Sequence, residues 1–418
     1  MSDALLVSDL TRRAKAASER VAELATDVKD GALRLAADRL EAATRAILRE
    51  NALDLEAGRA HGLDAAMLDR LMLDPERIAG IARGLREVAA LPDPVGEITR
   101  MWNRPNGLQV GRMRIPLGVI LVIYESRPNV TADVAALCLK SGNATILRGG
   151  SEALHSNTAI AAVLRSALGD AGVPEDALQL VPRSDREIVD LLLLREDEID
   201  LVIPRGGESL IRRVAEKSRI PVIKHYNGIC HVYLDEFADP KRARELTLDS
   251  KCQRVSVCNA AETLLVHASL AKTVLPDVLG ALVAHGVELH ACARTREHFP
   301  SALPASDEDF RTEWLAKTMS VRTVDSLDQA IDHIRRYGSN HTETIVTQDV
   351  TRAREFVRRV NSSSVFVNAS TRFSDGFRLG LGAEVGVSTT KMHWYGPMGL
   401  EGLTTQKFIA YGEGTLVE

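Results

Sequence analysis

The stretch GVILVIYESRPNVTADVAALCLKSGNATILRGG, residues 118–150, decides the fold of this chain. It opens with an apolar run rich in β-branched residues at 119–124. It continues with an apolar helical pattern that includes 132–139 and returns to a β-rich run at 145–147. Two such runs joined by a helix indicate a βαβ crossover, and therefore a parallel sheet with helices on its faces.

The same alternation of strand and helix continues in two series and predicts two α/β domains. Further strands of the first series are expected at 178–181, 201–204 and 221–223. Strands of the second series are expected at 231–234, 262–267, 319–324, 343–347 and 364–368. The length of 418 residues agrees, since it exceeds what one hydrophobic core usually organises.

Three segments lie outside these alternations. Residues 1–92 read as helices because apolar positions recur at helical spacing, and a new helix is expected to begin at Pro75 after Asp74. The dipeptide Asn106-Gly107 predicts a β-hairpin with a tight turn. The tail is rich in glycine from Gly380 onward and ends in an expected strand at 404–411.

The composition is that of an ordinary globular protein, with 45% hydrophobic and 26% charged residues. The 52 Lys and Arg against 57 Asp and Glu give a formal charge of −5, and no basic cluster favours nucleic acid or an anionic membrane. No signal peptide is expected, and the apolar stretch at 118–124 is too short to span a bilayer. The five cysteines are odd in number and irregularly spaced, which favours a reducing cytoplasm over a disulfide framework.

Two short segments echo each other and suit a bound phosphate. They are RGGSE at 148–152 and RGGES at 205–209, each after an apolar strand and before a helix. Glycines let the backbone approach a ligand closely, and the N–H groups of a helix N-terminus attract an anion. A plain tight turn would show the same pattern, and neither segment is the G-x-G-x-x-G of a dinucleotide fold.

Among the thiols, Cys258 has the setting most typical of a nucleophile. It lies in QRVSVCNAA at 253–261, between a polar loop and a strand, four residues after Arg254. A nearby cation lowers the pKa of a thiol and favours the reactive thiolate. A packed, inert cysteine remains an alternative, as does Cys252 as the nucleophile. Cys138, Cys230 and Cys292 fit a buried core.

A metal site is a competing reading of the histidines. His225 and His231 bracket Cys230, but this spacing matches no zinc pattern, so we expect no metal.

Seven fragments in order along the chain resemble the γ-glutamyl phosphate reductases, also called glutamate-5-semialdehyde dehydrogenases, of the aldehyde dehydrogenase superfamily. The similarity covers nearly the whole chain. The fragments are ESRPNV at 125–130, SGNA at 141–144 with LRGGSE at 147–152, IPRGG at 203–207, HYNG at 225–228, VCNA at 257–260, DGF at 375–377 with GLGAEVG at 380–386, and GPMGLEGL at 396–403.

The resemblance implies an α/β, aldehyde-dehydrogenase-like fold with two parallel-sheet domains and an oligomerisation arm made of a β-hairpin and a C-terminal strand. Residues 1–98 and 118–228 would form the NADP-binding domain, and 229–379 the catalytic domain. Residues 99–117 and 380–418 would form the arm, which implies a homodimer or tetramer. A transient contact with glutamate 5-kinase is a further expected partnership.

The resemblance also implies an activity, the NADPH-dependent reduction of L-glutamyl 5-phosphate in the second step of proline biosynthesis. Cys258 would form a thioester, while Asn129 and the backbone N–H of Cys258 would bind the oxyanion. Arg127 and Arg254 are candidates for the leaving phosphate. The residues expected to bind the cofactor are Arg148, Gly149, Ser151, Pro204, Gly206 and Gly207.

Three positions depart from patterns that the resemblance leads us to expect. His225 stands where hydrolytic relatives carry a water-activating glutamate, which suits a thioester that is not hydrolysed, although simple packing is the favoured reading for His225. Val255 replaces a proline before the nucleophile, and Trp394-Tyr395 replaces Ala-Arg, which puts substrate affinity in doubt.

The rival functions are a hydrolytic thiol-dependent aldehyde dehydrogenase of the same fold and a non-catalytic nucleotide-binding scaffold. A fused kinase has no sequence left to form it.

Overall fold

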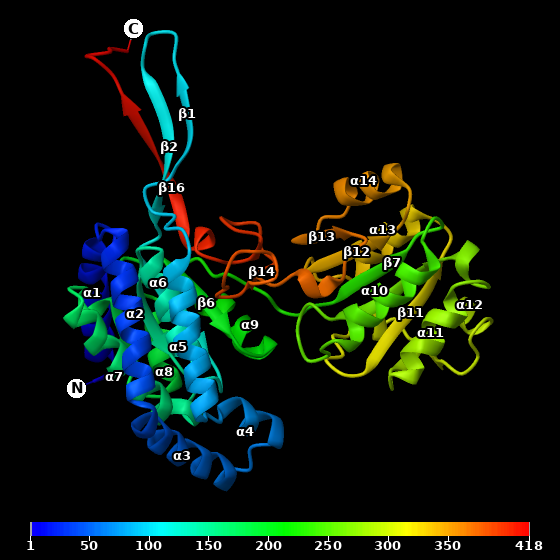
Figure 1. Cartoon of the computed structure of the whole chain (residues 1–418), viewed down its shortest axis with the longest axis horizontal. Helices are drawn as coiled ribbons and strands as arrows, with labels where there is room; N and C mark the ends of the chain where they lie inside the picture. The colour runs from blue at the N-terminus through cyan, green and yellow to red at the C-terminus, as the bar shows by residue number, and fades with distance from the viewer. Residues whose placement is uncertain (1, 418) are drawn as a thin grey trace. The chain divides into compact units, whose positions relative to one another are not determined.

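The computed structural model describes residues 2–417, which fall into two compact units (Figure 1). The first unit comprises Met1–Lys224, Leu381–Gly386 and Met398–Glu418, and the second comprises His225–Gly380 and Val387–Pro397. The chain therefore enters the second unit at His225, returns to the first at Leu381, and enters the second again for Val387–Pro397. None of the helices within residues 2–417 is both long and apolar enough to cross a membrane.

Five helices open the first unit, as the apolar spacing predicts. The start at Pro75 has a clear local cause, since the Asp74 side chain accepts a hydrogen bond from the N–H of Arg77 and proline fits the first helical position. The five helices are α1 (Asp3–Val21), α2 (Thr26–Ala42), α3 (Thr44–Ala60), α4 (Ala65–Leu71) and α5 (Pro75–Ala90).

The first unit is built on a four-stranded parallel sheet with the order β5-β4-β3-β6. All six residues of the central strand β3 are buried, which is typical of a sheet covered on both faces. Its elements are β3 (Val119–Tyr124), α6 (Asn129–Lys140), β4 (Ala144–Arg148), α7 (Leu154–Asp170), β5 (Leu178–Leu180), α8 (Arg186–Leu192), β6 (Leu201–Arg205) and α9 (Glu208–Lys217).

The strand expected at 221–223 is not a full strand. The segment touches β6 only through an isolated bridge between Val222 and Val202. Pro221 has no N–H to donate, so the ladder cannot extend in that direction.

A three-stranded antiparallel sheet in the order β1-β2-β16 extends from the first unit (Figure 1). The turn between β1 and β2 contains Gly107 with φ of +86°, a conformation that glycine adopts without strain. The hairpin and the final strand both form where the sequence predicts them. The strands are β1 (Ile98–Asn103), β2 (Gln109–Pro116) and β16 (Thr404–Tyr411).

The second unit is built on a seven-stranded parallel sheet with the order β10-β9-β11-β8-β7-β12-β13. Five of its strands are predicted, and the two short ones at its edge are not. Its strands are β7 (Cys230–Leu234), β8 (Ala261–His267), β9 (Glu288–Ala291), β10 (Leu303–Pro304), β11 (Thr318–Val324), β12 (Thr342–Val346) and β13 (Ser364–Val367). Its main helices are α10 (Pro240–Cys252), α11 (Leu275–Ala284), α12 (Ala293–Arg296), α13 (Leu327–Tyr337) and α14 (Val350–Arg359).

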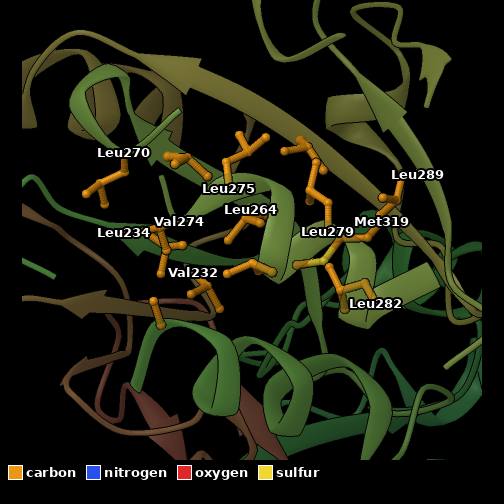
Figure 2. Close-up of a cluster of buried hydrophobic side chains, with 14 of the residues drawn as sticks. Val232, Leu234, Leu264, Leu270, Val274, Leu275, Leu279, Leu282, Leu289 and Met319 are labelled. Atoms are coloured by element: carbon orange, nitrogen blue, oxygen red, sulfur yellow. The ribbon is translucent and has the colours of Figure 1, made fainter. Parts of the chain in front are cut away.

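Alternate residues of the central strands enter two separate cores on the two faces of this sheet. Leu264 of β8 packs with Leu275 and Leu279 of α11 (Figure 2), whereas Leu265 packs with Phe356 of α14 on the other face. Full burial of one such side chain stabilises the fold by about 1.5–3 kcal/mol. The strands are thus fixed from both sides, and so are the loops that precede them.

Candidate functional site

Three side chains from three different loops meet at the amino edge of the second sheet. His225 lies before β7, Cys258 before β8, and His341 immediately before β12. These three strands are neighbours in the order β8-β7-β12, and parallel strands have their amino ends at one edge. One sulfur or nitrogen atom of each of the three residues lies within 4.8 Å of the other two.

The backbone around Cys258 is held by the segment that carries His225. The Cys230 thiol donates to the carbonyl oxygen of Cys258 at 3.2 Å. A Cβ atom at Gly228 would stand 2.0 Å from that same oxygen, so only glycine allows this approach. The N–H of Gly228 in turn donates to Glu313 Oε1 at 2.9 Å. The HYNG fragment therefore has a structural reason, which is to support the loop of Cys258.

The five thiols differ in burial, and none of them is in a disulfide. Cys138 and Cys230 are fully buried, and burial raises the pKa of Cys138 to about 12 and that of Cys230 well above its usual range. Burial also raises the pKa of Cys252, which packs against the hydrophobic core of the second unit. Cys258 and Cys292 are half-buried, and of these two only Cys258 lies beside the histidines. This arrangement favours Cys258 over Cys252 as the nucleophile.

Arg372 lies in electrostatic range of two other guanidinium groups, those of Arg254 and Arg378, and of Cys258. Arg372 is buried, and its Nε donates to Gln253 Oε1 at 2.9 Å. Burial, followed by repulsion from Arg378, lowers the pKa of Arg372; Arg254 acts in the same direction, and Cys258 acts in the opposite one. Such a cluster is suited to an anionic group with several oxygens, because arginine pairs well with phosphate and carboxylate.

The two histidines beside Cys258 are also coupled to each other. The ring centroids of His225 and His341 are 4.8 Å apart. Burial, and then His225, holds the pKa of His341 well below its usual range, so His341 is neutral at physiological pH. His231 is not part of this group, since its Nδ1 contacts Glu343 Oε2 at 2.8 Å inside the core. The group of His225, His231 and Cys230 weighed from the sequence therefore does not form.

In the first unit, Arg148 ends β4 and extends a partly buried guanidinium toward the loop before α8. Its Nη2 donates to the carbonyl oxygen of Ser184 at 2.5 Å, while its buried Nε has no hydrogen-bond partner within residues 2–417. Burial is the main cause of its lowered pKa, and repulsion from Arg186 contributes. Two cations thus lie near the carboxyl end of a parallel strand, where open α/β sheets commonly bind ligands.

Gly206 and Gly207 precede α9, and the carboxylate of Glu125 lies against both of them. The backbone N–H of Gly207, at the N-cap of α9, donates to Glu125 Oε2 at 3.2 Å. A Cβ at Gly206 would meet the Glu125 carboxyl at 2.6 Å. The helix N-terminus thus attracts an anionic group, as the sequence suggests. The other cofactor candidates, Pro204 in β6 and the exposed Ser151, lie next to these two turns.

Asn129 is the first residue of α6, and its side chain is held by a hydrogen bond to another residue of the same helix. Its Nδ2 donates to Asp133 Oδ2 at 2.8 Å. Burial raises the pKa of Asp133 from 3.8 to about 6, against the lowering effects of Asn129 and Arg205. One N–H of the Asn129 amide is thus committed to Asp133, and an amide nitrogen has a second N–H to donate elsewhere.

Replacement of Asp133 by asparagine is expected to have a pH-dependent effect on stability. Relative to the parent chain, the variant should be more stable at about pH 8 than at about pH 5. The folded chain retains a proton on Asp133 that the unfolded chain loses between pH 3.8 and about 6. The contribution of this group to stability is therefore greatest below that window and is lost as the pH rises through it. The Tm of the Asp133→Asn variant minus the Tm of the parent chain should therefore increase by a few degrees from the lower to the higher pH. A gap that is constant with pH would contradict the assigned pKa.

The comparisons with known proteins identify the family and the fold. The family model described as "Aldehyde dehydrogenase family" matches residues 2–288. A γ-glutamyl phosphate reductase of Geobacter sp. (strain M21) is 56% identical over 414 residues, which is 99% of each chain. The chain belongs to the γ-glutamyl phosphate reductase family. It is an oxidoreductase of the aldehyde dehydrogenase type.

The crystal structure of a γ-glutamyl phosphate reductase from Thermotoga maritima superimposes with a TM-score of 0.97 at 40% identity, covering 99% of this chain and 100% of the other. The predicted aldehyde-dehydrogenase-like fold is thereby confirmed. An acetylating aldehyde dehydrogenase from Geobacillus thermoglucosidasius, at 15% identity and a TM-score of 0.69, shares the fold as well; it covers 100% of this chain and 98% of its own.

In this member of the γ-glutamyl phosphate reductase family, the surroundings of Cys258 include some of the residues predicted from the sequence and some that were not predicted. Arg254 and Cys258 both lie in electrostatic range of Arg372, whereas Arg127 belongs to the first unit and is exposed. His341 and Arg372 are additions that the sequence did not reveal. Arg372 lies three residues before the DGF fragment, and that closeness to a family fragment was the one local signal available.

Proposed function

We propose that this enzyme reduces L-glutamyl 5-phosphate to L-glutamate 5-semialdehyde and phosphate with NADPH, the second step of proline biosynthesis. Full-length relatives carry the name γ-glutamyl phosphate reductase. The observation that carries the proposal is the half-buried Cys258 in electrostatic range of the buried Arg372, with Arg254 and Arg378 close by. A nucleophile beside clustered guanidinium groups matches a substrate whose reacting carbon carries a phosphate.

The chain's own residues supply most of the chemistry. The Cys258 thiolate attacks the acyl carbon, the C–O bond to phosphate breaks, and a thioester forms. Arg372 and its neighbours offset the charge of the leaving phosphate. The backbone N–H of Cys258 and the Asn129 amide are the proposed donors to the oxyanion, as the family resemblance implies, and one such donor is worth about 10²–10³ in rate. After reduction, the thiohemiacetal loses the hydroxyl proton and releases the aldehyde and the Cys258 thiolate.

The first unit has residues that fit a phosphorylated nicotinamide cofactor. The buried Arg148 Nε lacks a partner within residues 2–417, and Arg186 adds a second cation beside it. A Cβ at Gly149 would stand 2.2 Å from Asn157 Nδ2, so a larger residue there would have to displace the buried Asn157 side chain. Arg148 and Arg186 would hold a 2′-phosphate. The N-terminus of α9 would hold a second phosphate group once the Glu125 carboxylate moves away from the Gly207 N–H. When bound, the cofactor supplies the hydride that reduces the thioester.

Replacement of Arg148 by glutamine is expected to raise the KM for NADPH by about 10–100-fold and to leave the KM for NADH nearly unchanged. Only NADPH carries the 2′-phosphate that this guanidinium would bind. Arg183→Gln is the matched control, in the loop that Arg148 contacts, because Arg183 is already paired with Asp3 at 2.8 Å. Steady-state kinetics with both cofactors checks this; an equal loss with NADPH and NADH would remove Arg148 from phosphate recognition.

The reverse reaction tests the proposed function directly. Glutamate semialdehyde and NADP⁺ are incubated with and without inorganic phosphate, and NADPH formation is followed. NADPH formation beyond one equivalent per active site is expected only with phosphate, because phosphate must cleave the thioester before the enzyme can turn over again. Turnover that is indifferent to phosphate would mean hydrolysis of the thioester, and would favour the alternative of a hydrolytic aldehyde dehydrogenase. His225, and not a glutamate, beside Cys258 supports the phosphate-dependent reaction.

We also propose that the sheet β1-β2-β16 joins subunits into a homodimer or tetramer. Phe408 is 65% exposed, and its ring makes an edge contact with Trp102 and lies 4.4 Å from the Arg112 guanidinium. An exposed sheet with apolar side chains and open edges is a typical pairing surface.

The substitution Phe408→Glu should shift the assembly toward smaller species in light scattering. Lys407→Gln, on the opposite face of β16, is the control that should keep the parental mass. Unchanged mass in both variants would contradict an interface on the Phe408 face.

A further inference from the structure

Cys258, His225 and His341 together offer one thiol sulfur and two imidazole nitrogens, and these three atoms lie within 4.8 Å of one another. Sulfur and imidazole nitrogen are the donors that zinc prefers in proteins. The residues come from three loops at one sheet edge, so their meeting is a product of the fold and leaves no spacing signal in the sequence. His225 and Cys258 are half-buried and His341 is buried, so two of the three residues are partly exposed.

The hydrogen bonding of the His341 ring is that of a typical metal-binding histidine. Its Nδ1 lies 2.7 Å from Thr342 Oγ1 and 3.6 Å from Cys230 Sγ, so that nitrogen is already engaged. Its Nε2 is buried and has no hydrogen-bond partner within residues 2–417. In metal sites the second ring nitrogen is typically hydrogen-bonded to a neighbouring group, which fixes the ring and leaves the other nitrogen for the ion.

We propose that His225, Cys258 and His341 form a binding site for a thiophilic divalent cation, Zn²⁺, and that the bound ion reversibly masks the Cys258 sulfur. Ligands of a tetrahedral Zn²⁺ at about 2.0–2.3 Å stand roughly 3.3–3.8 Å apart. The group therefore has to contract by about 1 Å at its widest pair, which side-chain rotation of the half-buried members can supply. Coordination releases the thiol proton, and the fourth position is left for water.

The consequence for activity rests on the proposed function. A sulfur bound to Zn²⁺ has its lone pair engaged and cannot attack an acyl carbon, so the ion acts as a removable inhibitor. The ion is not required for the reaction that we propose, because no step in it uses a Lewis acid.

Binding can be measured without any turnover. Zinc chloride is titrated into the full-length protein in competition with a chromophoric chelator, and the expected stoichiometry is one tight site per chain. Cys258→Ser and His225→Gln should each weaken Zn²⁺ binding by at least about 10–100-fold. That is the loss typical when a residue that hydrogen-bonds a metal ligand is removed, and removal of a ligand itself should cost no less. Cys292→Ser, which alters another half-buried thiol of the second unit, should bind like the parent chain. Parental affinity in Cys258→Ser would overturn the site.

Alkylation by iodoacetamide, mapped cysteine by cysteine by mass spectrometry, places the ion on the sulfur. Zn²⁺ should slow labelling of Cys258 by at least about tenfold, leave Cys292 unaffected, and lose its effect when EDTA is added or when His225 is glutamine. His341→Gln should behave in the same way, and if that buried change prevents folding, His225→Gln carries the test. Labelling of Cys258 that Zn²⁺ does not slow would refute the site.

The two proposals fail separately. Protection of Cys258 by Zn²⁺ in a protein without phosphate-dependent turnover keeps the site and removes the reaction. Phosphate-dependent turnover without protection keeps the reaction and removes the site.

Discussion

Replacement of Cys258 by serine is expected to lower phosphate-dependent NADPH formation from glutamate semialdehyde by about 10⁴-fold or more. A serine hydroxyl is a poor nucleophile unless a base activates it, and the thioester that carries the reaction cannot form. The change removes little volume from a half-buried position, so we expect the fold and the affinity for NADP⁺ to remain parental. Initial rates with saturating substrate, together with NADP⁺ titration, check both expectations.

Cys252→Ser is the matched control, since Cys252 lies at the end of α10 and belongs to the same loop region. Its side chain packs against the core of the second unit, and its pKa is raised by burial, so its loss should change the rate by less than about twofold. A loss of turnover in Cys252→Ser with normal turnover in Cys258→Ser would reverse the assignment of the nucleophile. Normal turnover in both variants would exclude thiol catalysis.

The strands were predictable where the signal is local. The apolar run of β3 and the Asn106-Gly107 turn carry their conformation in adjacent residues, and both form as expected. The short strands β9 and β10, at one end of the second sheet, were missed because they have no such local signal. One is four residues long and mixes polar with apolar side chains, and the other has only two residues. Such segments become strands because a neighbouring strand offers hydrogen bonds, and this depends on the sheet order.

The site was predictable in the same partial way. Cys258 stands out because an arginine and a polar loop precede it, and these are neighbours in the sequence. His341 and Arg372 join it only because β12 lies beside β7 and because the segment after β13 returns to the loop of Cys258. The Asn259 side chain makes that return visible, since its Nδ2 donates to the carbonyl oxygen of Ser374 at 2.9 Å. Contacts between segments so far apart depend on the completed sheet, and periodicity does not encode them.

Replacement of Gly228 by alanine is expected to lower kcat by about 100-fold or more. Among substitutions that leave the Cys258 thiol itself unchanged, we expect this one to have the largest effect. The added Cβ would stand 2.0 Å from the carbonyl oxygen of Cys258 and 2.8 Å from its Cα, so the two loops must separate. Backbone, unlike the end of a flexible side chain, cannot turn aside, and a displacement of about 1 Å at a reacting group can cost 10²-fold.

The control is Gly280→Ala in α11, where an added Cβ meets no atom within 4 Å. That change should keep parental kcat and stabilise the fold by about 0.5–1 kcal/mol, because alanine is the better helix former. The measurements are kcat, the rate of Cys258 alkylation and circular dichroism. A folded Gly228→Ala variant with parental kcat would show that the support of Cys258 by the HYNG segment is dispensable. A variant with lowered kcat and an altered alkylation rate at Cys258 alone would show that this glycine positions the nucleophile.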